Sequence, residues 1–202
     1  MKAKICGITH LTDALLAVNH GAWAIGFNFY KHSPRCISMN RAREIASQLP
    51  KHITTVGIMI DYSRDEMLEV LEFIDLVQIC QPDNSLFLDK MRVIMALQAT
   101  RTDVLPESLN LHEYGFVLLD APRQNDGLLG GTGRFADWDF ARDLAIEHKL
   151  ILAGGLNSSN VVSAIKHVKP FAVDVASGVE EQPGSKSPRA VKEFLLKCKN
   201  TK

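Results

Sequence analysis

The chain has 202 residues, a length that allows one substantial hydrophobic core. Lysine plus arginine and aspartate plus glutamate both total 23, which excludes the basic excess of a nucleic-acid-binding protein and also an acidic tail. No apolar run approaches the roughly 18 residues of a membrane span, and the early lysines Lys2 and Lys4 interrupt any signal-peptide core, so we expect a cytoplasmic protein without membrane contact.

Short apolar runs alternate with segments of helical periodicity along the chain. The first run ends at Cys6, and further strands are expected at residues 24–27, 55–60, 76–79, 92–96, 116–119, 150–152 and 172–175. Helices are expected at residues 11–19, 40–49, 64–73, 85–90, 137–147, 159–168 and 188–198. Thr12 is the expected cap of the first helix and His20-Gly21 its end, whereas residues 100–113 carry only a weak pattern.

Eight strand segments, most of them followed by a helix, favour parallel strands that are buried on both faces. The count predicts the α/β class and one compact (β/α)8 TIM barrel over residues 1–202, although about 250 residues is usual for that fold. An open doubly wound sheet is the alternative, with its ligand at a topological switch point. The sequence has neither GxGxxG after the first strand nor GxxxxGK[ST], the nucleotide signals of such sheets.

The stretch that ends the first strand offers a candidate for chemistry. Cys6 follows an apolar run and precedes Gly7, which frees the backbone to turn. In barrels of this class the carboxyl ends of the strands carry the active site. A buried cysteine that only packs is the more common outcome for a thiol considered alone.

The four cysteines do not indicate a metal site. Cys6, Cys36, Cys80 and Cys198 are widely scattered, without a CxxC pair and without a histidine at ligand spacing. This pattern argues against zinc and against a disulfide framework.

Glycine-rich turns after late strands predict a phosphate-binding site. Gly154 and Gly155 follow the seventh strand and lead into a helix start, while Ser177 and Gly178 follow the eighth. Loops at these two places form the recurring phosphate grip of the barrel class, because glycine lets backbone N–H groups approach an anion. A third cluster at residues 130–133, containing Gly131, Thr132 and Gly133, is a candidate to close over the same end. A lone glycine pair would indicate only a tight turn.

Taken together, these motifs resemble the phosphoribosylanthranilate isomerase family. The resemblance rests on Lys-Ile-Cys-Gly-Ile-Thr at 4–9, Ser-Pro-Arg at 33–35, Leu-Leu-Asp at 118–120, and the segments 130–133, 153–157 and 174–180. It implies a TIM barrel of the ribulose-phosphate-binding type that acts in tryptophan biosynthesis. The implied reaction is the Amadori rearrangement of N-(5-phosphoribosyl)anthranilate to 1-(o-carboxyphenylamino)-1-deoxyribulose 5-phosphate, without metal or organic cofactor.

By the same resemblance Cys6 is the general base, Asp120 the general acid, and Arg35 the group that holds the anthranilate carboxylate. These residue types suit the chemistry, since ring opening needs a proton on the ring oxygen and the next step removes one from C2. Asp120 then needs a pKa above the usual value of about 3.9, and Cys6 has to ionise near neutral pH although a free thiol titrates at about 8.5. Positive potential from helix starts or from Lys4 is a candidate for assisting Cys6. Arg35 offers the two parallel donors that a planar carboxylate needs, and its alternative is a solvated loop arginine.

The sequence departs from the family pattern at three positions. Cys80 replaces a histidine, Ala176 replaces a serine, and Ser187 replaces an aspartate. Cys80 either packs or adds a second thiol to the pocket. None of the changes affects Cys6, Arg35 or Asp120, so we expect an active enzyme. Asp174 is either a partner for sugar hydroxyls or a buried group satisfied within the barrel mouth.

Two alternatives to the isomerase remain. One is a sugar-phosphate-binding barrel that has lost turnover, suggested by the changes at Cys80, Ala176 and Ser187. The other is a neighbouring enzyme, either indole-glycerol-phosphate synthase, which needs an early lysine and glutamate set, or the histidine-pathway isomerase, which needs an aspartate where Cys6 stands. In each case the expected partner is a small phosphorylated molecule, and the chain is expected to be a monomer or a homodimer.

Overall fold

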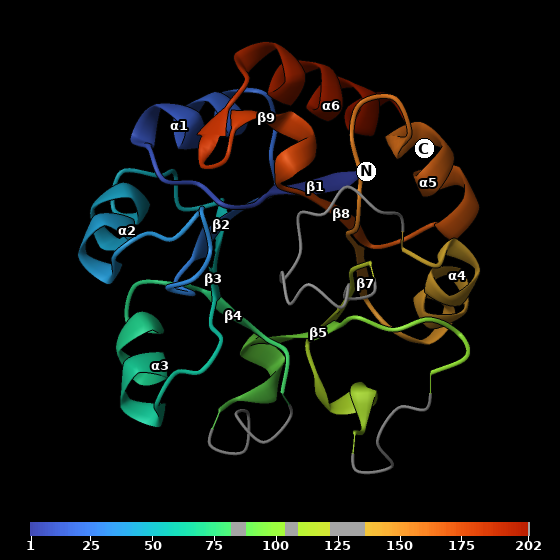
Figure 1. The fold of residues 1–202 in the computed structure, drawn as a ribbon, viewed down its shortest axis with the longest axis horizontal. Coiled ribbons are helices and arrows are strands. Elements are labelled where there is room, and N and C mark those ends of the chain that lie inside the picture. Colours follow the sequence, from blue (N-terminus) through green and yellow to red (C-terminus); the bar gives the residue numbers. More distant parts are fainter. Residues whose placement is uncertain (82–87, 104–108, 122–135, 202) are drawn as a thin grey trace.

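The computed structural model describes residues 1–81, 88–103, 109–121 and 136–201. Over these residues eight parallel strands form a closed barrel in the order β1 to β8, with β8 paired to β1 (Figure 1). The expected barrel is therefore confirmed, and the open sheet is excluded. The strands are β1 (Lys2–Ile5), β2 (Ala24–Asn28), β3 (Thr54–Ile58), β4 (Leu76–Ile79), β5 (Val93–Leu97), β6 (Phe116–Leu119), β7 (Leu150–Leu152) and β8 (Ala172–Val175).

Helices surround the barrel on its outside (Figure 1). They are α1 (Leu11–Asn19), α2 (Met39–Ala46), α3 (Arg64–Val70), α4 (Trp138–Glu147), α5 (Val161–Val168) and α6 (Pro188–Asn200). Short 3₁₀ turns add η2 (Lys90–Arg92), η3 (Leu111–Glu113) and η4 (Ser177–Val179), and a small hairpin joins β9 (Glu180–Gln182) to β10 (Ser185–Lys186). None of the helices in the described part of the chain is long and apolar enough to cross a bilayer.

Two helix expectations need correction. The first half of the expected helix at 85–90 lies outside the described residues, and its last residue, Lys90, begins the 3₁₀ turn η2. Asp89 caps this turn by accepting the Met91 N–H at 3.0 Å, which suits a tight turn directly before β5. Thr12 is not the cap of α1, because the helix already begins at Leu11 and His10 occupies the cap position without a side-chain bond.

The alternation of side chains along each strand divides the core into two parts. One cluster contains inward residues of neighbouring strands, such as Ala24, Val56, Ile94 and Ile151, and fills the barrel. The other contains the opposite strand positions packed against the helices, for example Ile25 beneath the outer layer. Side chains alternate between the two faces of a strand. Beyond this packed layer, the inward positions near the carboxyl ends of the strands therefore face the open end of the barrel.

Candidate active site

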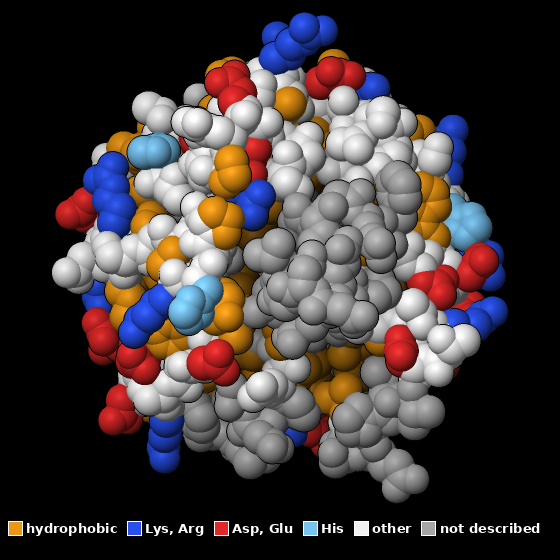
Figure 2. All heavy atoms as spheres, in the orientation of Figure 1, with side chains coloured by type: hydrophobic (Ala, Val, Ile, Leu, Met, Phe, Trp, Pro, Cys, Tyr) orange, Lys and Arg blue, Asp and Glu red, His pale blue; other side chains and the backbone are white. Residues whose placement is uncertain are grey.

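A cavity opens at the carboxyl ends of the strands, where the barrel packing stops. Its empty space, including the part open to solvent, is about 730 Å³. The residues around it are mostly the inward positions that follow the packed layer. They are Cys6, Asn28, Tyr30, Ser33, Arg35, Ile58, Ile60, Gln78, Cys80, Ala96, Gln98, Leu118, Asp120, Asp174 and Ala176. On the face drawn in Figure 2 the charged side chains of both signs are scattered around the rim.

Cys6 and Asp120 both line this cavity. Cys6 follows β1 and its N–H donates to the Val175 carbonyl at 2.8 Å, so the eighth strand holds its backbone. Asp120 follows β6 and its N–H donates to the Leu97 carbonyl at 2.9 Å. Strands from two different parts of the barrel therefore bring a thiol and a carboxyl group to one space.

The turn after Cys6 depends on a glycine for two reasons. Gly7 has φ of 73°, in the region that residues with a side chain rarely adopt. A Cβ at this position would lie 2.6 Å from Cδ of Arg35. The absence of a side chain at Gly7 thus also makes the space through which Arg35 reaches the cavity.

A lysine ammonium lies inside the barrel, below the cavity. Lys4 is fully buried, and its Nζ is 3.0 Å from Oδ2 of Asp174 and 3.1 Å from Oε1 of Gln78. Lys4 and Asp174 are register partners on β1 and β8, whereas Gln78 reaches from β4. Oδ1 of Asp174 is buried and has no hydrogen-bond partner in the part of the chain that the structure describes. Asp174 is thus satisfied on one oxygen only, and the other oxygen is left for a ligand group.

The electrostatics of Cys6 differ from the sequence expectation. Burial raises the pKa of the Cys6 thiol above its ordinary value, and although Lys4 and Lys186 lower it, Asp174 opposes them. The thiol is therefore protonated at neutral pH in the unliganded protein. Burial alone would lower the pKa of Lys4, but attraction from Asp174 and Cys6 outweighs burial and raises it, so Lys4 stays charged. Burial of the thiol outweighs the effect of Lys4 on the pKa of Cys6, and the Asp174 carboxylate further offsets it.

For Asp120 the expected direction is confirmed. Burial raises its pKa to about 6, and the nearby Asp174 adds to the shift, while the Ala121 N–H and Lys4 act in the opposite direction. The Ala121 N–H donates to Oδ1 of Asp120 at 2.8 Å, which fixes the carboxyl group at the strand end. A carboxyl group with this pKa retains a protonated fraction near neutral pH, as a general acid requires.

Arg35 is not a solvated loop residue. Its guanidinium lines the cavity and binds Glu180 in a fork, with Nε 2.9 Å from Oε1 and Nη2 2.7 Å from Oε2. Nη1 takes no part in this pair. The structure thus supplies an internal carboxylate where the sequence analysis expected only a ligand carboxylate.

Lys186 completes this buried group and was missed by the sequence analysis. Its Nζ lies 2.7 Å from Oε1 of Glu180 and donates to the carbonyls of Cys6 and Ala176 at 2.6 and 3.2 Å. It therefore joins the ends of β1 and β8 with the Arg35–Glu180 pair. The sequence signal that could have found it is the family's Pro-Gly-x-Lys-Asp pattern, which reads Pro-Gly-Ser-Lys-Ser at residues 183–187.

The two glycine turns after β7 and β8 lie in contact. Gly154 and Gly155 have φ of 83° and 64°, and a Cβ at Gly178 would lie 1.9 Å from the carbonyl oxygen of Leu156. Ser177 begins the 3₁₀ turn η4 of which Gly178 is the second residue. The expected convergence of these turns is confirmed, whereas Gly131, Thr132 and Gly133 lie outside the described residues.

Comparison with known proteins places the chain in a family. The family model for N-(5'phosphoribosyl)anthranilate (PRA) isomerase matches residues 3–197. The chain belongs to the phosphoribosylanthranilate isomerase family. A relative from Pelobacter propionicus is 39% identical over 206 residues, covering 100% of this chain and 97% of that protein.

Solved structures of phosphoribosylanthranilate isomerases share the fold. The one from Thermotoga maritima superimposes with a TM-score of 0.86 at 37% identity and covers 98% of both chains. Another, in complex with reduced 1-(o-carboxyphenylamino)-1-deoxyribulose 5-phosphate, has a TM-score of 0.84 at 35% identity, again with 98% coverage of both.

One departure from the pattern of the phosphoribosylanthranilate isomerases concerns the cavity wall. Cys80 lines the cavity and also packs against the cluster inside the barrel. Of the two expectations for Cys80, the second thiol in the pocket is therefore correct. Ala176 lines the same cavity, so both substitutions change its wall.

Proposed function

We propose that this chain catalyses the rearrangement of N-(5′-phosphoribosyl)anthranilate to 1-(o-carboxyphenylamino)-1-deoxyribulose 5-phosphate, a step of tryptophan biosynthesis. Family membership over residues 3–197 supports this proposal. The observation that carries it is that Cys6 and Asp120, from β1 and β6, line one cavity. An acid and a base on different walls of one cavity can serve the two proton transfers of the reaction.

In the first step Asp120 gives its proton to the furanose ring oxygen. The C1–O bond breaks, the lone pair of the anthranilate nitrogen forms the C1=N bond, and Asp120 becomes a carboxylate. The pKa of about 6 keeps part of the carboxyl population protonated for this transfer. The product of the step is an open-chain iminium cation.

In the second step Cys6 removes the proton from C2. The electron pair of the C2–H bond forms the C1=C2 bond, and the nitrogen regains its lone pair, which gives an enolamine. Burial raises the pKa of Cys6 and so disfavours the thiolate that acts as the base. The positive charge of the iminium cation stabilises this thiolate at the step that needs it. Protonation at C1 and loss of the C2 hydroxyl proton then yield the ketone.

The remaining site residues bind the substrate in this proposal. Arg35 holds the anthranilate carboxylate through Nη1, the guanidinium nitrogen outside the Glu180 pair. Oδ1 of Asp174, which has no partner among the described residues, accepts from a sugar hydroxyl. The N–H groups of the contacting turns bind the phosphate, with Gly154 and Gly155 on one side and Ser177 and Gly178 on the other. The sequence also makes Gly131, Thr132 and Gly133 candidates to close over this end, and they lie outside the described residues.

The proposal assigns no metal or organic cofactor to the reaction and places the protein in the cytoplasm as one domain. A relative from Thermotoga maritima is described as dimeric, with monomers generated from it. Light scattering decides whether the present chain is a homodimer or a monomer.

The test of the proposed function is a direct assay. Freshly prepared phosphoribosylanthranilate is incubated with the protein, and the decay of its fluorescence is compared with the decay in buffer. We expect decay that is proportional to enzyme concentration. Decay equal to that in buffer, together with saturable binding of the substrate, would instead identify a sugar-phosphate-binding barrel without turnover.

A further inference from the structure

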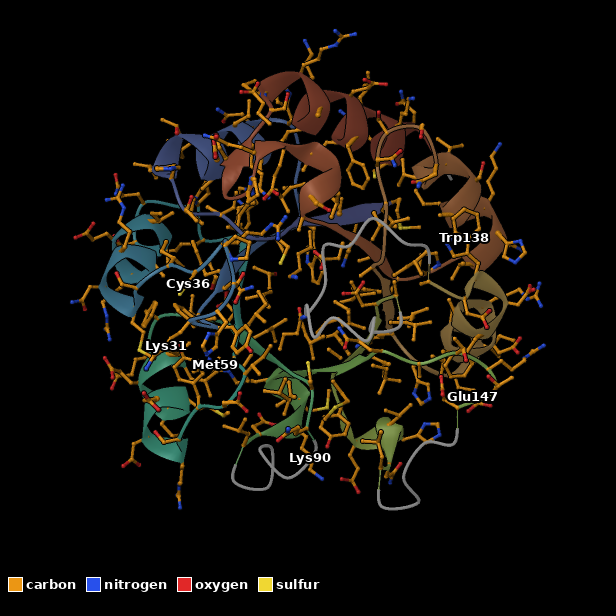
Figure 3. All side chains as sticks on the ribbon, viewed as in Figure 1. Lys31, Cys36, Met59, Lys90, Trp138 and Glu147 are labelled. Atoms are coloured by element: carbon orange, nitrogen blue, oxygen red, sulfur yellow. The ribbon has the colours of Figure 1, made fainter. Side chains whose placement is uncertain are left out.

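Three side chains with metal-binding atoms meet at the end of the barrel opposite the cavity. His112 lies in η3 shortly before β6, Glu147 is the last residue of α4, and His148 follows Glu147 and is separated from β7 by Lys149. Figure 3 shows Glu147 at the periphery of the barrel, outside the ring of strands. The amino ends of barrel strands usually serve stability and not catalysis.

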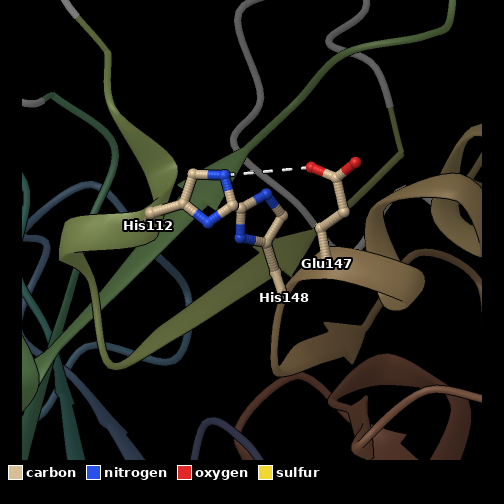
Figure 4. A group of neighbouring side chains, drawn as sticks. All are labelled: His112, Glu147 and His148. Carbon is tan, nitrogen blue, oxygen red and sulfur yellow. Dashed lines mark ion pairs between the residues drawn. The ribbon is translucent and has the colours of Figure 1, made fainter.

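The three groups are close enough to share one ion. One ligand atom from each residue lies within 4.8 Å of the others. The two imidazole rings have centroids 4.6 Å apart, and Nε2 of His112 is 3.8 Å from Oε2 of Glu147. Figure 4 shows the two rings beside each other with the carboxylate at one edge of the pair. Ligand bonds to zinc are about 2.0–2.2 Å, so atoms that share the ion lie roughly 3 to 4 Å apart.

The remaining adjustment is small and falls on mobile side chains. The side chains of His112 and Glu147 are 65% and 66% exposed, so each can rotate without disturbing the core. His148 is half-buried, and its N–H donates to the Leu144 carbonyl at 2.9 Å, which fixes the backbone at this ligand. One anchored ligand and two adaptable ones can close around an ion with little change in the fold.

Local charge also favours a cation. Glu147 and His148 lie at the carboxyl end of α4, where the helix dipole attracts positive charge. The neighbouring Lys149 directs its ammonium over the Phe116 ring, 5.7 Å from the centroid. Lys90, the other nearby lysine, is paired with Glu113. These two cations are thus engaged elsewhere, and the Glu147 carboxylate faces the His112 ring, with Oε2 3.8 Å from Nε2.

We propose that His112, Glu147 and His148 form a binding site for a divalent transition-metal ion of the zinc type. Two imidazoles and one carboxylate are a recognised ligand set for Zn²⁺, and solvent completes the fourth position. The ion ties η3 to the junction of α4 and β7, and so stabilises the folded chain, because these ligands meet only after folding. Residue spacing along the chain does not indicate this site, since His112 is distant from the other two ligands.

The test is a titration of the EDTA-treated, reduced protein with Zn²⁺ alone, followed by calorimetry. We expect one ion per chain, and binding weakened about tenfold or more in His112→Gln and in Glu147→Gln. His167→Gln is the matched control, because His167 also contacts a carboxylate, Asp139, at 2.9 Å on the surface but has no second ligand group of this kind beside it among the described residues. The control should bind Zn²⁺ as the parent does.

Thermal unfolding gives a second measurement. Zn²⁺ should raise the Tm of the parent and of His167→Gln, and the rise should be lost in His112→Gln and Glu147→Gln. His148→Gln adds a third variant. If this substitution of a half-buried residue lowers stability by itself, the variants at the exposed residues His112 and Glu147 still test the proposal. Equal affinity and an equal Tm rise in parent, His112→Gln and Glu147→Gln would overturn the proposal. Turnover of phosphoribosylanthranilate should be the same in all of these proteins, so this outcome is independent of the proposed function.

Discussion

The ammonium of Lys4 and the carboxylate of Asp174 form an ion pair of 3.0 Å inside the barrel, one inward position below Cys6. The pair acts on both the proposed base and the proposed acid, since Asp174 raises the pKa of Cys6 and of Asp120 while Lys4 lowers both. The two members of the pair therefore oppose one another at both reacting groups. A change in either member should alter the chemistry as well as the stability.

Lys4→Met should be strongly destabilising. It removes the cation from a buried pair and leaves the Asp174 carboxylate uncompensated, which typically costs about 3–5 kcal/mol. The loss should be smaller in the double variant Lys4→Met with Asp174→Asn, because no buried charge is then left alone. Urea unfolding of the parent, both single variants and the double variant measures this coupling. Additive effects of the two substitutions would show that the pair contributes no interaction.

Cys6→Ser and Asp120→Asn should lower kcat far more than they change KM. Each removes one proton-transfer group, and such groups typically contribute about 10² to 10⁴ in rate. Steady-state kinetics with phosphoribosylanthranilate give both constants, and circular dichroism checks that the variants are folded. Near-parental turnover in either variant would remove that residue from its assigned role.

The pH profile of kcat/KM should have an acid limb that ends near pH 6. The active form carries protonated Asp120, with a pKa of about 6, and ionised Cys6, whose pKa is raised above its ordinary value. Below pH 6 Asp120 is already protonated, so the rate falls as Cys6 ionises less. Above pH 6 the fraction of protonated Asp120 falls as the fraction of Cys6 thiolate rises. These two changes cancel, so kcat/KM stays constant until the pH reaches the pKa of Cys6.

The variant Asp120→Asn shows whether the break near pH 6 comes from Asp120 or from a group of the substrate. Its residual kcat/KM should rise with pH through 6 without a break, since only Cys6 then titrates. The substrate phosphate also loses its second proton near pH 6, at about the same value. A break at 6 that persists in Asp120→Asn would therefore assign the limb to the phosphate.

Asp120→Asn should also stabilise the protein at neutral pH. The folded-state pKa of Asp120, about 6, lies above its ordinary value of 3.8, so ionisation of this group disfavours the folded state as pH rises from about 4 to 6. The shift of about two units corresponds to about 3 kcal/mol, which is fully felt above pH 6 and absent below the unfolded pKa. Asparagine keeps the acceptor for the Ala121 N–H and removes the charge. Urea unfolding at pH 7 and at pH 4 should show a gain only at pH 7, and an equal difference at both values would rule out the buried charge as its cause.

Arg35→Ala should raise KM with a smaller change in kcat. The substitution removes the donors proposed for the anthranilate carboxylate, while Glu180 keeps its contact with Lys186 and so is not left unpaired. Arg35→Lys retains the charge but cannot form the fork with Glu180, and we expect it to behave more like alanine than like the parent. Unaltered kcat and KM in both variants would place Arg35 outside the binding site.

Sequence reasoning succeeded where a local pattern decides the outcome. Apolar runs located β4 and β6 at their observed bounds, and burial at a strand end predicted the raised pKa of Asp120. It failed where the answer depends on a distant partner. Burial is the main cause of the raised pKa of Cys6. The register of β8 against β1 adds to it, because it pairs Lys4 with Asp174, whose carboxylate also raises that pKa. The fork between Arg35 and Glu180 depends on the same kind of tertiary placement.

The closure of the barrel has a consequence for how the molecule is made. The backbone of Cys6 is held by Val175, and the Cys6 carbonyl accepts from Lys186, so the earliest part of the chain depends on one of the latest. During synthesis from the amino end, the first strand must wait for the eighth before its thiol has a fixed position. A ribosome-bound chain that lacks the last quarter of the sequence therefore lacks the residues that hold Cys6 in place. The catalytic site then forms in one late step and not gradually.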